Sequence, residues 1–357
     1  MGRVVLVTGV ARYLGGRFAR LLSADPAVDR VIGVDVVPPP HDIGTTGFVR
    51  ADIRNPVIAR IIDHAGVDTV VHMSVIATPI GAGGRVSMKE INVIGTMQLL
   101  AACQKSSSLR RLVVKSTTAV YGSSPRDPAM FTEDTGAKVL PRGGWAKDSI
   151  EVEGYVRGFI RRRPDVHTVM LRLANIVGPA MRTPLTDYFC MPVVPTVLGF
   201  DGRLQFIHED DALEAVRLAT VRDLSGVINV AGDGIVTVSQ AARMAGRPTL
   251  PVPPPLTGTV GQVFRRAGLA DFSREQMRFL SFGRGVDTTR MRSLLGLEPG
   301  YTTRAAFADF VRGRGLTGPL SPETVELVES RLLNVFSRNG EGLADVAAGA
   351  SAGGSAG

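Results

Sequence analysis

Short apolar runs alternate with helix-like segments through the first half of the chain, and this alternation constrains the fold more than any other feature. Apolar runs bounded by turn residues are typical of buried parallel strands. They cover Val4 to Thr8, Val31 to Asp35, Thr69 to Met73, Leu112 to Ser116 and Val169 to Leu173. The helical patterns between them lie near Leu14 to Ser23, Pro56 to His64, Met88 to Cys103 and Asp148 to Arg162. This order predicts an α/β fold with a doubly wound parallel sheet and helices on both faces.

The second half of the chain is less regular. After Asn175 it becomes rich in proline and glycine, and a strand and helix return only between Leu204 and Ala219, followed by a strand at Gly226 to Val230. We expect a main domain of residues 1–175 and 204–234, and a smaller C-terminal lobe of residues 176–203 and 235–335 over the carboxyl ends of the strands. The small-residue tail, 340–357, cannot bury a core and is expected to be disordered.

Charge and composition exclude several classes of function. The net charge is +8, but the basic residues are scattered, and the one run, Arg161 to Arg163, ends a predicted helix where cations favour the helix dipole. Nucleic acid is therefore not an expected partner. Cys103 and Cys190 lie far apart and the histidines lack ligand spacing, so we expect no metal site. No apolar stretch is long enough to span a bilayer, and a cytoplasmic location is expected.

The text TGVARYLGG follows the first strand immediately and opens a helix. Gly9 permits a tight turn, and either Gly15 or Gly16 permits close packing of helix on sheet. The first helical amides, near Arg12, Tyr13 and Leu14, are expected to face a pyrophosphate. This is a Rossmann-type dinucleotide site. The alternative is an arbitrary glycine-rich turn.

Asp35, at the end of the second strand, is placed to accept hydrogen bonds from the adenosine ribose. Its charge repels a 2′-phosphate, so NAD is expected rather than NADP. The alternative is a solvated aspartate at a strand end.

Further blocks of the chain resemble one family of enzymes. They are RADIRNP, TVVHMS, INVIGTMQLL, KSTTAVYGSS, LRLANIVGP, FIHEDDALEAV and DTTRMRSLLGLEP. Over about residues 3–315 the chain is similar to extended short-chain dehydrogenases/reductases of the NAD-dependent epimerase/dehydratase family, in the actinobacterial branch that is UDP-glucose 4-epimerase-like. The resemblance implies that Asp52 and Ile53 flank the adenine, that Met73 and Ser74 line the cofactor path, and that Asn92 steadies the active-site helix.

The resemblance also implies the reacting groups. Thr117 would be the catalytic hydroxyl and touch the substrate, Lys147 would hold the nicotinamide ribose, and Asn175 would contact the substrate. Each of the carried-over polar residues also has a structural alternative, as a turn, packing or capping residue. A homodimer through the helices Met88 to Cys103 and Asp148 to Arg162 is likewise implied.

The chain departs from the family pattern at its first turn. Arg12 stands where the family's glycine motif has a third glycine, so a side chain occupies a place of close pyrophosphate approach. Arg12 can pair with Asp35, with the pyrophosphate or with the 2′-phosphate of NADP.

A second departure concerns the catalytic base. The family uses a YxxxK pair in which the tyrosine takes the substrate proton, but four residues before Lys147 stands Gly143. Three explanations remain open: Lys147, Tyr121 or Tyr188 substitutes as base; the protein is a non-catalytic NAD-binding sensor or interaction protein; or the substrate is acidic enough to need little help. The lone tryptophan, Trp145, lies close enough to Lys147 in sequence to report on cofactor binding.

The substrate expected from the resemblance is a nucleotide sugar, whose diphosphate would be met by arginines of the smaller lobe: Arg182, Arg203, Arg265 or Arg290. Leu204 and Gln205 replace an Arg-Asp pair of the family, which favours as the alternative a dehydrogenase of a steroid-like or other hydrophobic alcohol.

Overall fold

A central parallel sheet organises the structure, a computed structural model that describes residues 2–75, 84–254 and 274–316. Its seven strands follow the order β11-β6-β5-β4-β1-β2-β3, and every neighbouring pair is parallel. The strands are β1 (Arg3–Thr8), β2 (Val28–Asp35), β3 (Gly47–Arg50), β4 (Thr69–His72), β5 (Arg111–Thr117), β6 (His167–Leu173) and β11 (Gly226–Val230). The chain runs outward from β1 through β2 to β3, then returns to β4 and runs the other way. This reversal confirms the doubly wound α/β fold and places the switch point between β1 and β4.

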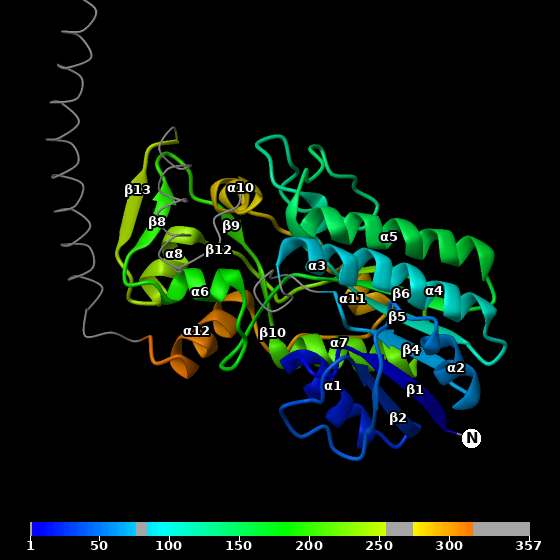
Figure 1. The fold of residues 1–357 in the computed structure, drawn as a ribbon. Helices are drawn as coiled ribbons and strands as arrows, with labels where there is room; N and C mark the ends of the chain where they lie inside the picture. The colour runs from blue at the N-terminus through cyan, green and yellow to red at the C-terminus, as the bar shows by residue number, and fades with distance from the viewer. Residues whose placement is uncertain (1, 76–83, 255–273, 317–357) are drawn as a thin grey trace, which may run out of the picture.

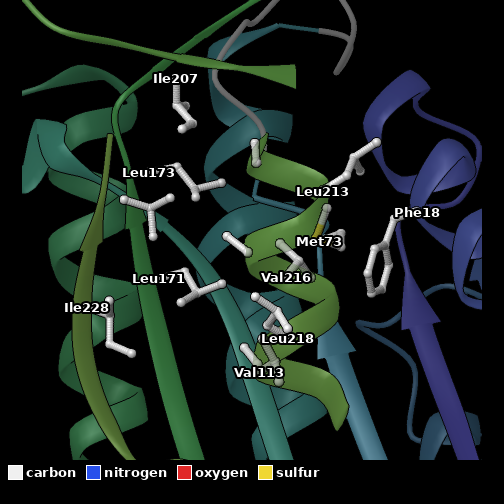
Figure 2. Packing of buried hydrophobic residues seen from close by; sticks show 14 of the residues in the cluster. Phe18, Met73, Val113, Leu171, Leu173, Ile207, Leu213, Val216, Leu218 and Ile228 are labelled. Atoms are coloured by element: carbon white, nitrogen blue, oxygen red, sulfur yellow. The ribbon is translucent and has the colours of Figure 1, made fainter. Parts of the chain in front are cut away.

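Helices cover both faces of this sheet (Figure 1). On one face lie α1 (Tyr13–Ser23) and α7 (Glu209–Val221). On the other lie α2 (Val57–His64), α4 (Thr96–Lys105) and α5 (Gly144–Arg162). Figure 2 shows Leu213 and Val216 of α7 and Phe18 of α1 over the strand residues of the first face. Because both faces are buried, the strands are apolar throughout, which is why they could be recognised in the sequence.

The helix predicted from Met88 to Cys103 consists of three pieces. It begins earlier, as α3 (Arg85–Lys89), continues as the π-helical η2 (Glu90–Gly95) and ends as α4. A side chain at Gly95 would lie 2.8 Å from Ile53 Cδ1, so this segment packs closely on the loop after β3. The short edge strand β3 was missed, since its four residues carry no buried side.

The remaining elements pack around a separate apolar cluster that includes Phe189, Phe206, Phe307 and Phe310. Its helices are α6 (Pro184–Cys190), α8 (Val238–Met244), α10 (Arg274–Phe282) and α12 (Thr303–Gly313), with α11 (Thr289–Ser293) beside β11. Two-stranded pairs connect them: β7 (Asn175–Val177) with β10 (Phe206–His208), β9 (Arg203–Leu204) with β12 (Val236–Thr237), and β8 (Val194–Val197) with β13 (Thr249–Val252). The division into two lobes stays a prediction, and residues 317–335 and the tail 340–357 lie outside the described residues. No helix within the described ranges is both long and apolar enough to cross a membrane.

Candidate functional site

The turn after β1 is held by backbone contacts that only glycine permits. Gly9 has φ of +81°, and its amide donates to Val34 O at 3.0 Å. A Cβ on Gly9 would lie 3.0 Å from Ser74 Oγ, and a Cβ on Gly15 would lie 2.2 Å from Gly9 O. The first turn of α1 therefore packs directly on the carboxyl ends of β1 and β4.

The start of α1 carries no side-chain cap. Arg12 is the N-cap, in an extended conformation (φ −90°, ψ 149°), and no side chain caps the helix. The first amides of an uncapped helix offer hydrogen bonds and a positive dipole end to an anion. Burial lowers the pKa of Arg12, and the nearby Asp35 carboxylate opposes that shift. Arg12 and Asp35 thus belong to the same cluster at this turn.

Asp35 is fixed at the end of β2 by two backbone amides. Its carboxylate accepts from Ala11 N at 3.0 Å and from Val36 N at 2.8 Å. A carboxylate can accept about four hydrogen bonds, so Asp35 retains capacity for two hydroxyl groups. The sequence prediction that Asp35 and the Gly9 turn form one site agrees with this geometry.

The end of β4 is anchored through a buried histidine. His72 bonds Thr8 Oγ1 at 2.9 Å and Thr96 Oγ1 at 2.8 Å, and burial lowers its pKa to about 3. The following residue, Met73, donates its amide to Thr8 Oγ1 at 3.2 Å, which sets the path of the chain towards Ser74. Met73 and Ser74 are both buried, and Ser74 is the residue that meets Gly9.

An ion pair between the half-exposed Arg85 and the buried Asp148 positions the first turn of α5, where Lys147 lies. Asp148 is wholly buried and accepts two hydrogen bonds of 2.6 Å from Arg85. Asn92 Nδ2 lies 3.4 Å from the same carboxylate, and Arg85 also donates to Gly144 O at 2.9 Å. Asn92 thereby ties η2 to α5, consistent with the steadying role expected of it.

Thr117 and Lys147 stand on different elements. Thr117 ends β5 and caps η3 (Thr118–Tyr121), where its hydroxyl accepts from Ala119 N at 3.1 Å. Lys147, on α5, is half-exposed, with Glu151 at 4.0 Å. Gly143 is the N-cap of α5, so the position four residues before Lys147 carries no side chain.

The tyrosines lie elsewhere. Tyr121 is buried and donates to Asn229 Oδ1 at 2.7 Å while accepting from Arg172 at 2.8 Å. Tyr188 is buried and donates to Pro195 O at 2.8 Å. Tyr155 is exposed on α5, and Tyr301 stacks on His208. Both hydroxyls proposed as replacement bases are thus engaged in the scaffold.

Tyr13 and Leu14 differ in what they contact. The Tyr13 hydroxyl donates to Glu209 Oε1 at 3.0 Å and accepts from Arg17 at 3.1 Å, which ties α1 to the start of α7. Burial raises the pKa of Tyr13, with Glu209 adding to the effect. Leu14 is buried in the core under α1. The side chains of Tyr13 and Leu14 thus serve the scaffold, and only the backbone amides of these two residues are suited to bind a cofactor.

Two residues expected near the adenine follow β3. Asp52 binds Arg54 through the backbone amide at 2.9 Å and the guanidinium at 2.6 Å, and the Arg54 hydrogen bonds lower the pKa of Asp52. Ile53 is buried against Gly95. Asp52 thus stabilises the turn after β3 through Arg54.

The residues expected near the substrate are more dispersed. Asn175 lies on β7, paired with Phe206 of β10. Arg203 donates to Ala129 O at 3.0 Å, and Arg290 pairs with Asp134 at 2.5 Å. Arg265 lies outside the described residues. Gln205 is buried and donates to Gly232 O at 3.0 Å, so the position serves the scaffold.

Sequence reasoning missed Lys115. This lysine interrupts the apolar strand β5, and its ammonium donates to Val75 O at 3.2 Å. Burial, with the neighbouring charge of Arg12, lowers the pKa of Lys115 to about 8. The signal was present, because a lysine within a buried strand is uncommon unless it is paired. Within the described ranges, no group of three or more His, Cys, Asp or Glu residues could hold a metal ion.

Comparison with known proteins agrees with the fold. Residues 5–231 match the NAD dependent epimerase/dehydratase family. An uncharacterized protein of Mycobacterium tuberculosis is 48% identical over 342 residues, which make up 95% of this chain and 91% of that protein. DesIV, a dTDP-glucose 4,6-dehydratase from Streptomyces venezuelae with NAD bound, matches with a TM-score of 0.67 at 22% identity, over 88% of this chain and 97% of that one. The UDP-glucose 4-epimerase of Thermotoga maritima, with UDP-glucose, gives a TM-score of 0.66 at 18% identity over 87% and 98%. At these identities the two solved structures show a shared fold.

Proposed function

Because the chain belongs to the NAD-dependent epimerase/dehydratase family, we propose that it binds NAD at the carboxyl ends of β1, β2 and β4 and acts on the alcohol group of a nucleotide sugar. The observation that carries this proposal is the glycine turn. A Cβ on Gly15 would meet Gly9 O at 2.2 Å, so the uncapped start of α1 is drawn against the strand ends. This is the arrangement that accepts a pyrophosphate.

The residues at this turn fit the two halves of the dinucleotide. Asp35 would bind the adenosine ribose hydroxyls, and its charge would disfavour a 2′-phosphate, which supports NAD over NADP. Arg12 would neutralise the pyrophosphate while it stays close to Asp35. Met73 and Ser74 would line the path towards Thr117, and Asp52 and Ile53 would flank the adenine.

Bound NAD would supply a hydride acceptor for the carbinol carbon of the substrate. Thr117 would hold the reacting hydroxyl, Lys147 would bind the nicotinamide ribose, and Asn92 would keep the start of α5 in place through Asp148. Asn175 and Arg203 are proposed to contact the substrate. The solved relatives named for UDP-glucose and dTDP-glucose support a nucleotide sugar as the substrate class.

A second candidate function is a non-catalytic NAD-binding protein. It is favoured by one observation: Gly143 stands four residues before Lys147, and the hydroxyls of Tyr121 and Tyr188, the two candidate replacements, are hydrogen-bonded within the scaffold. Such a protein would bind the dinucleotide at the same turn but would not change its redox state.

The test begins with the protein as purified. Denaturation should release NAD or NADH, identified by mass and absorbance, and calorimetry should give tighter binding of NAD than of NADP. Binding of either dinucleotide to a folded sample refutes a purely structural role for the glycine turn. If the folded protein binds no nicotinamide dinucleotide, the proposal is wrong.

The substrate class is tested separately. With NAD present, UDP- and dTDP-sugars are expected to raise the melting temperature, whereas sterols are not. The opposite pattern would favour the hydrophobic-alcohol alternative. Epimerisation without net formation of NADH would indicate an epimerase, and accumulation of NADH would indicate a dehydrogenase. If neither is observed, the result would indicate a binding protein.

We also propose a homodimer built from α4 and α5. Val86 on α3 and Ile94 on η2, which lead into α4, and Tyr155 on α5 are all exposed in the single chain, with Val86 75% exposed. Large apolar side chains grouped on one layer favour association.

A further inference from the structure

We propose that Lys115 lies beside the nicotinamide half of the bound dinucleotide and takes the proton that the substrate alcohol loses. The inference rests on the proposed function and extends it. It assigns to a residue of β5 the proton-accepting role for which α5 carries no tyrosine, since Gly143 occupies that position.

The position of Lys115 follows from the strand order. The proposed cofactor path begins at Asp35 on β2, crosses the Gly9 turn at β1 and continues over the ends of β4 and β5. Lys115 is on β5, and its Nζ reaches Val75 O just beyond β4 at 3.2 Å. The ammonium is therefore on the β4–β5 side of the turn, past the pyrophosphate position. Thr117 is two residues further along, on the same face of the strand.

The largely buried ammonium of Lys115 has fewer hydrogen-bond partners than it has donors. A lysine ammonium has three hydrogen-bond donors, and among residues 2–75, 84–254 and 274–316 this one has a single acceptor, Val75 O. Among the residues that the structure describes, the ion pairs of lysines involve Lys89 and Lys147, both with Glu151. Lys115 has no such partner there, although its side chain is mostly buried. A buried cation without a counter-ion readily gives up its proton.

Two titratable groups from neighbouring elements interact with Lys115: the charge of Arg12 lowers the pKa of Lys115, and the charge of Lys115 in turn lowers the pKa of His72. Arg12, at the start of α1, adds its positive charge to the effect of burial, and together they lower the pKa of Lys115 to about 8. His72, on β4, has a pKa of about 3 and stays neutral near neutral pH. Lys115 is thus the group of this cluster whose charge changes between pH 7 and pH 9.

This property suits the chemistry. When the alcohol is oxidised, its C–H bond breaks with the hydride going to the oxidised nicotinamide, its O–H bond breaks, and a C=O bond forms. The released proton binds the lone pair of neutral Lys115 Nζ, which becomes an ammonium. Lys147 is a poorer candidate, because its side chain is 49% exposed beside Glu151.

The test compares NAD⁺ and NADH, which share the adenosine and the diphosphate but differ by one positive charge on the ring. The dissociation constants of both are measured by calorimetry from pH 6.5 to 9.5. A protonated Lys115 beside the ring repels the positive charge of NAD⁺ but not the neutral ring of NADH. The repulsion ends when Lys115 loses its proton, so Kd(NAD⁺)/Kd(NADH) should fall as the pH rises through about 8. A coupling of one pKa unit corresponds to about a tenfold fall.

Variants identify the titrating group. The ratio should become independent of pH in Lys115→Met and also in Lys115→Arg, which keeps the charge and provides a second variant if the first does not fold. The matched control Lys105→Met, an exposed residue of α4, should behave as the wild type.

The inference would be overturned if Kd(NAD⁺)/Kd(NADH) did not change with pH in a wild-type protein that binds both nucleotides, or if its pH dependence persisted in Lys115→Arg. It would also be overturned if the affinities for both nucleotides declined in parallel as the pH rises, because that result would place Lys115 at the diphosphate. If the folded wild type binds neither nucleotide, the proposed function fails, and this inference fails with it.

Discussion

Two glycines on helices differ in what a methyl group would meet. At Gly15 a Cβ would lie 2.2 Å from the carbonyl oxygen of Gly9, a backbone atom that cannot move without opening the turn. At Gly154, an exposed position of α5, nothing lies within 4 Å. The same substitution therefore tests the turn and the helix separately.

We expect Gly15→Ala to lower the free energy of unfolding by about 1–3 kcal/mol, as overpacking does, and to weaken NAD binding more than tenfold. Gly154→Ala should stabilise the protein by up to about 1 kcal/mol through helix propensity and leave binding unchanged. Urea titration and calorimetry measure the two effects. Equal NAD affinity in the two variants would contradict the proposed role of the turn.

Because His72 is buried, the free energy of unfolding is expected to fall at acidic pH. Its pKa is about 3 in the folded protein and 6.5 in the unfolded chain, so the unfolded chain binds the extra proton below pH 6.5. Stability contributed by neutral His72 is therefore complete above pH 6.5 and is lost as the pH falls towards 3, at up to about 1.4 kcal/mol per pH unit.

Urea titrations at pH 7, 6, 5 and 4 test this expectation. Between pH 6 and pH 4 the free energy of unfolding should fall less steeply in His72→Gln than in the wild type, whatever the variant costs at pH 7. His64→Gln, at an exposed position of α2, should retain the wild-type slope. An unchanged slope in His72→Gln would show that this histidine is not kept neutral by burial.

At the scale of elements, β6 and α5 are joined by a buried ion pair. Arg172 donates to Glu153 Oε1 at 2.9 Å and Oε2 at 2.7 Å, and both side chains are nearly inaccessible. Ser116 of β5 donates to the same carboxylate at 2.7 Å, and Arg172 also donates to the Tyr121 hydroxyl. The network thus locks the helix that carries Lys147 onto the strands that carry Thr117.

Removing one member of this pair should be costly. We expect Arg172→Met to destabilise the protein by about 3–5 kcal/mol, because it leaves the Glu153 carboxylate buried without its main partner. Arg157→Met is the matched control: this arginine also contacts Glu153, at 2.7 Å, but its side chain is 47% exposed, and it should cost at most about 1 kcal/mol. Denaturation at pH 7 gives both values, and similar losses would refute the distinction.

At the scale of the whole molecule, the exposed apolar residues of η2 and α5 predict association. Ile94→Glu combined with Tyr155→Glu should convert a dimer into a monomer, because burying two carboxylates at an interface is unfavourable. Leu294→Glu, at an equally exposed apolar residue after α11, should leave the mass unchanged. Light scattering coupled to gel filtration reports the mass. A monomeric wild type, or a dimer that survives the double substitution, would exclude this interface.

Local patterns in the sequence were sufficient for the sheet and for its first turn. Five buried strands of the sheet, from β1 to β6 without β3, were placed within a few residues, since a strand covered on both faces must be apolar along its length. Gly9 and Gly15 were identified because a positive φ and a close backbone approach both exclude a side chain. Asp35 followed from its place at a strand end.

Other features depend on contacts between residues distant in the chain, which no local pattern encodes. Lys115 reaches Val75, 40 residues away, and Tyr121 reaches Asn229, 108 residues away. Sequence reasoning named Tyr121 as a candidate base and missed Lys115. Burial and neighbouring charge set what each side chain can do, and these exist only after the strands pair. The sequence alone therefore determined the fold class and the glycine turn after β1, whereas only the tertiary structure decided which tyrosines are committed to the scaffold and which lysine lies near Arg12.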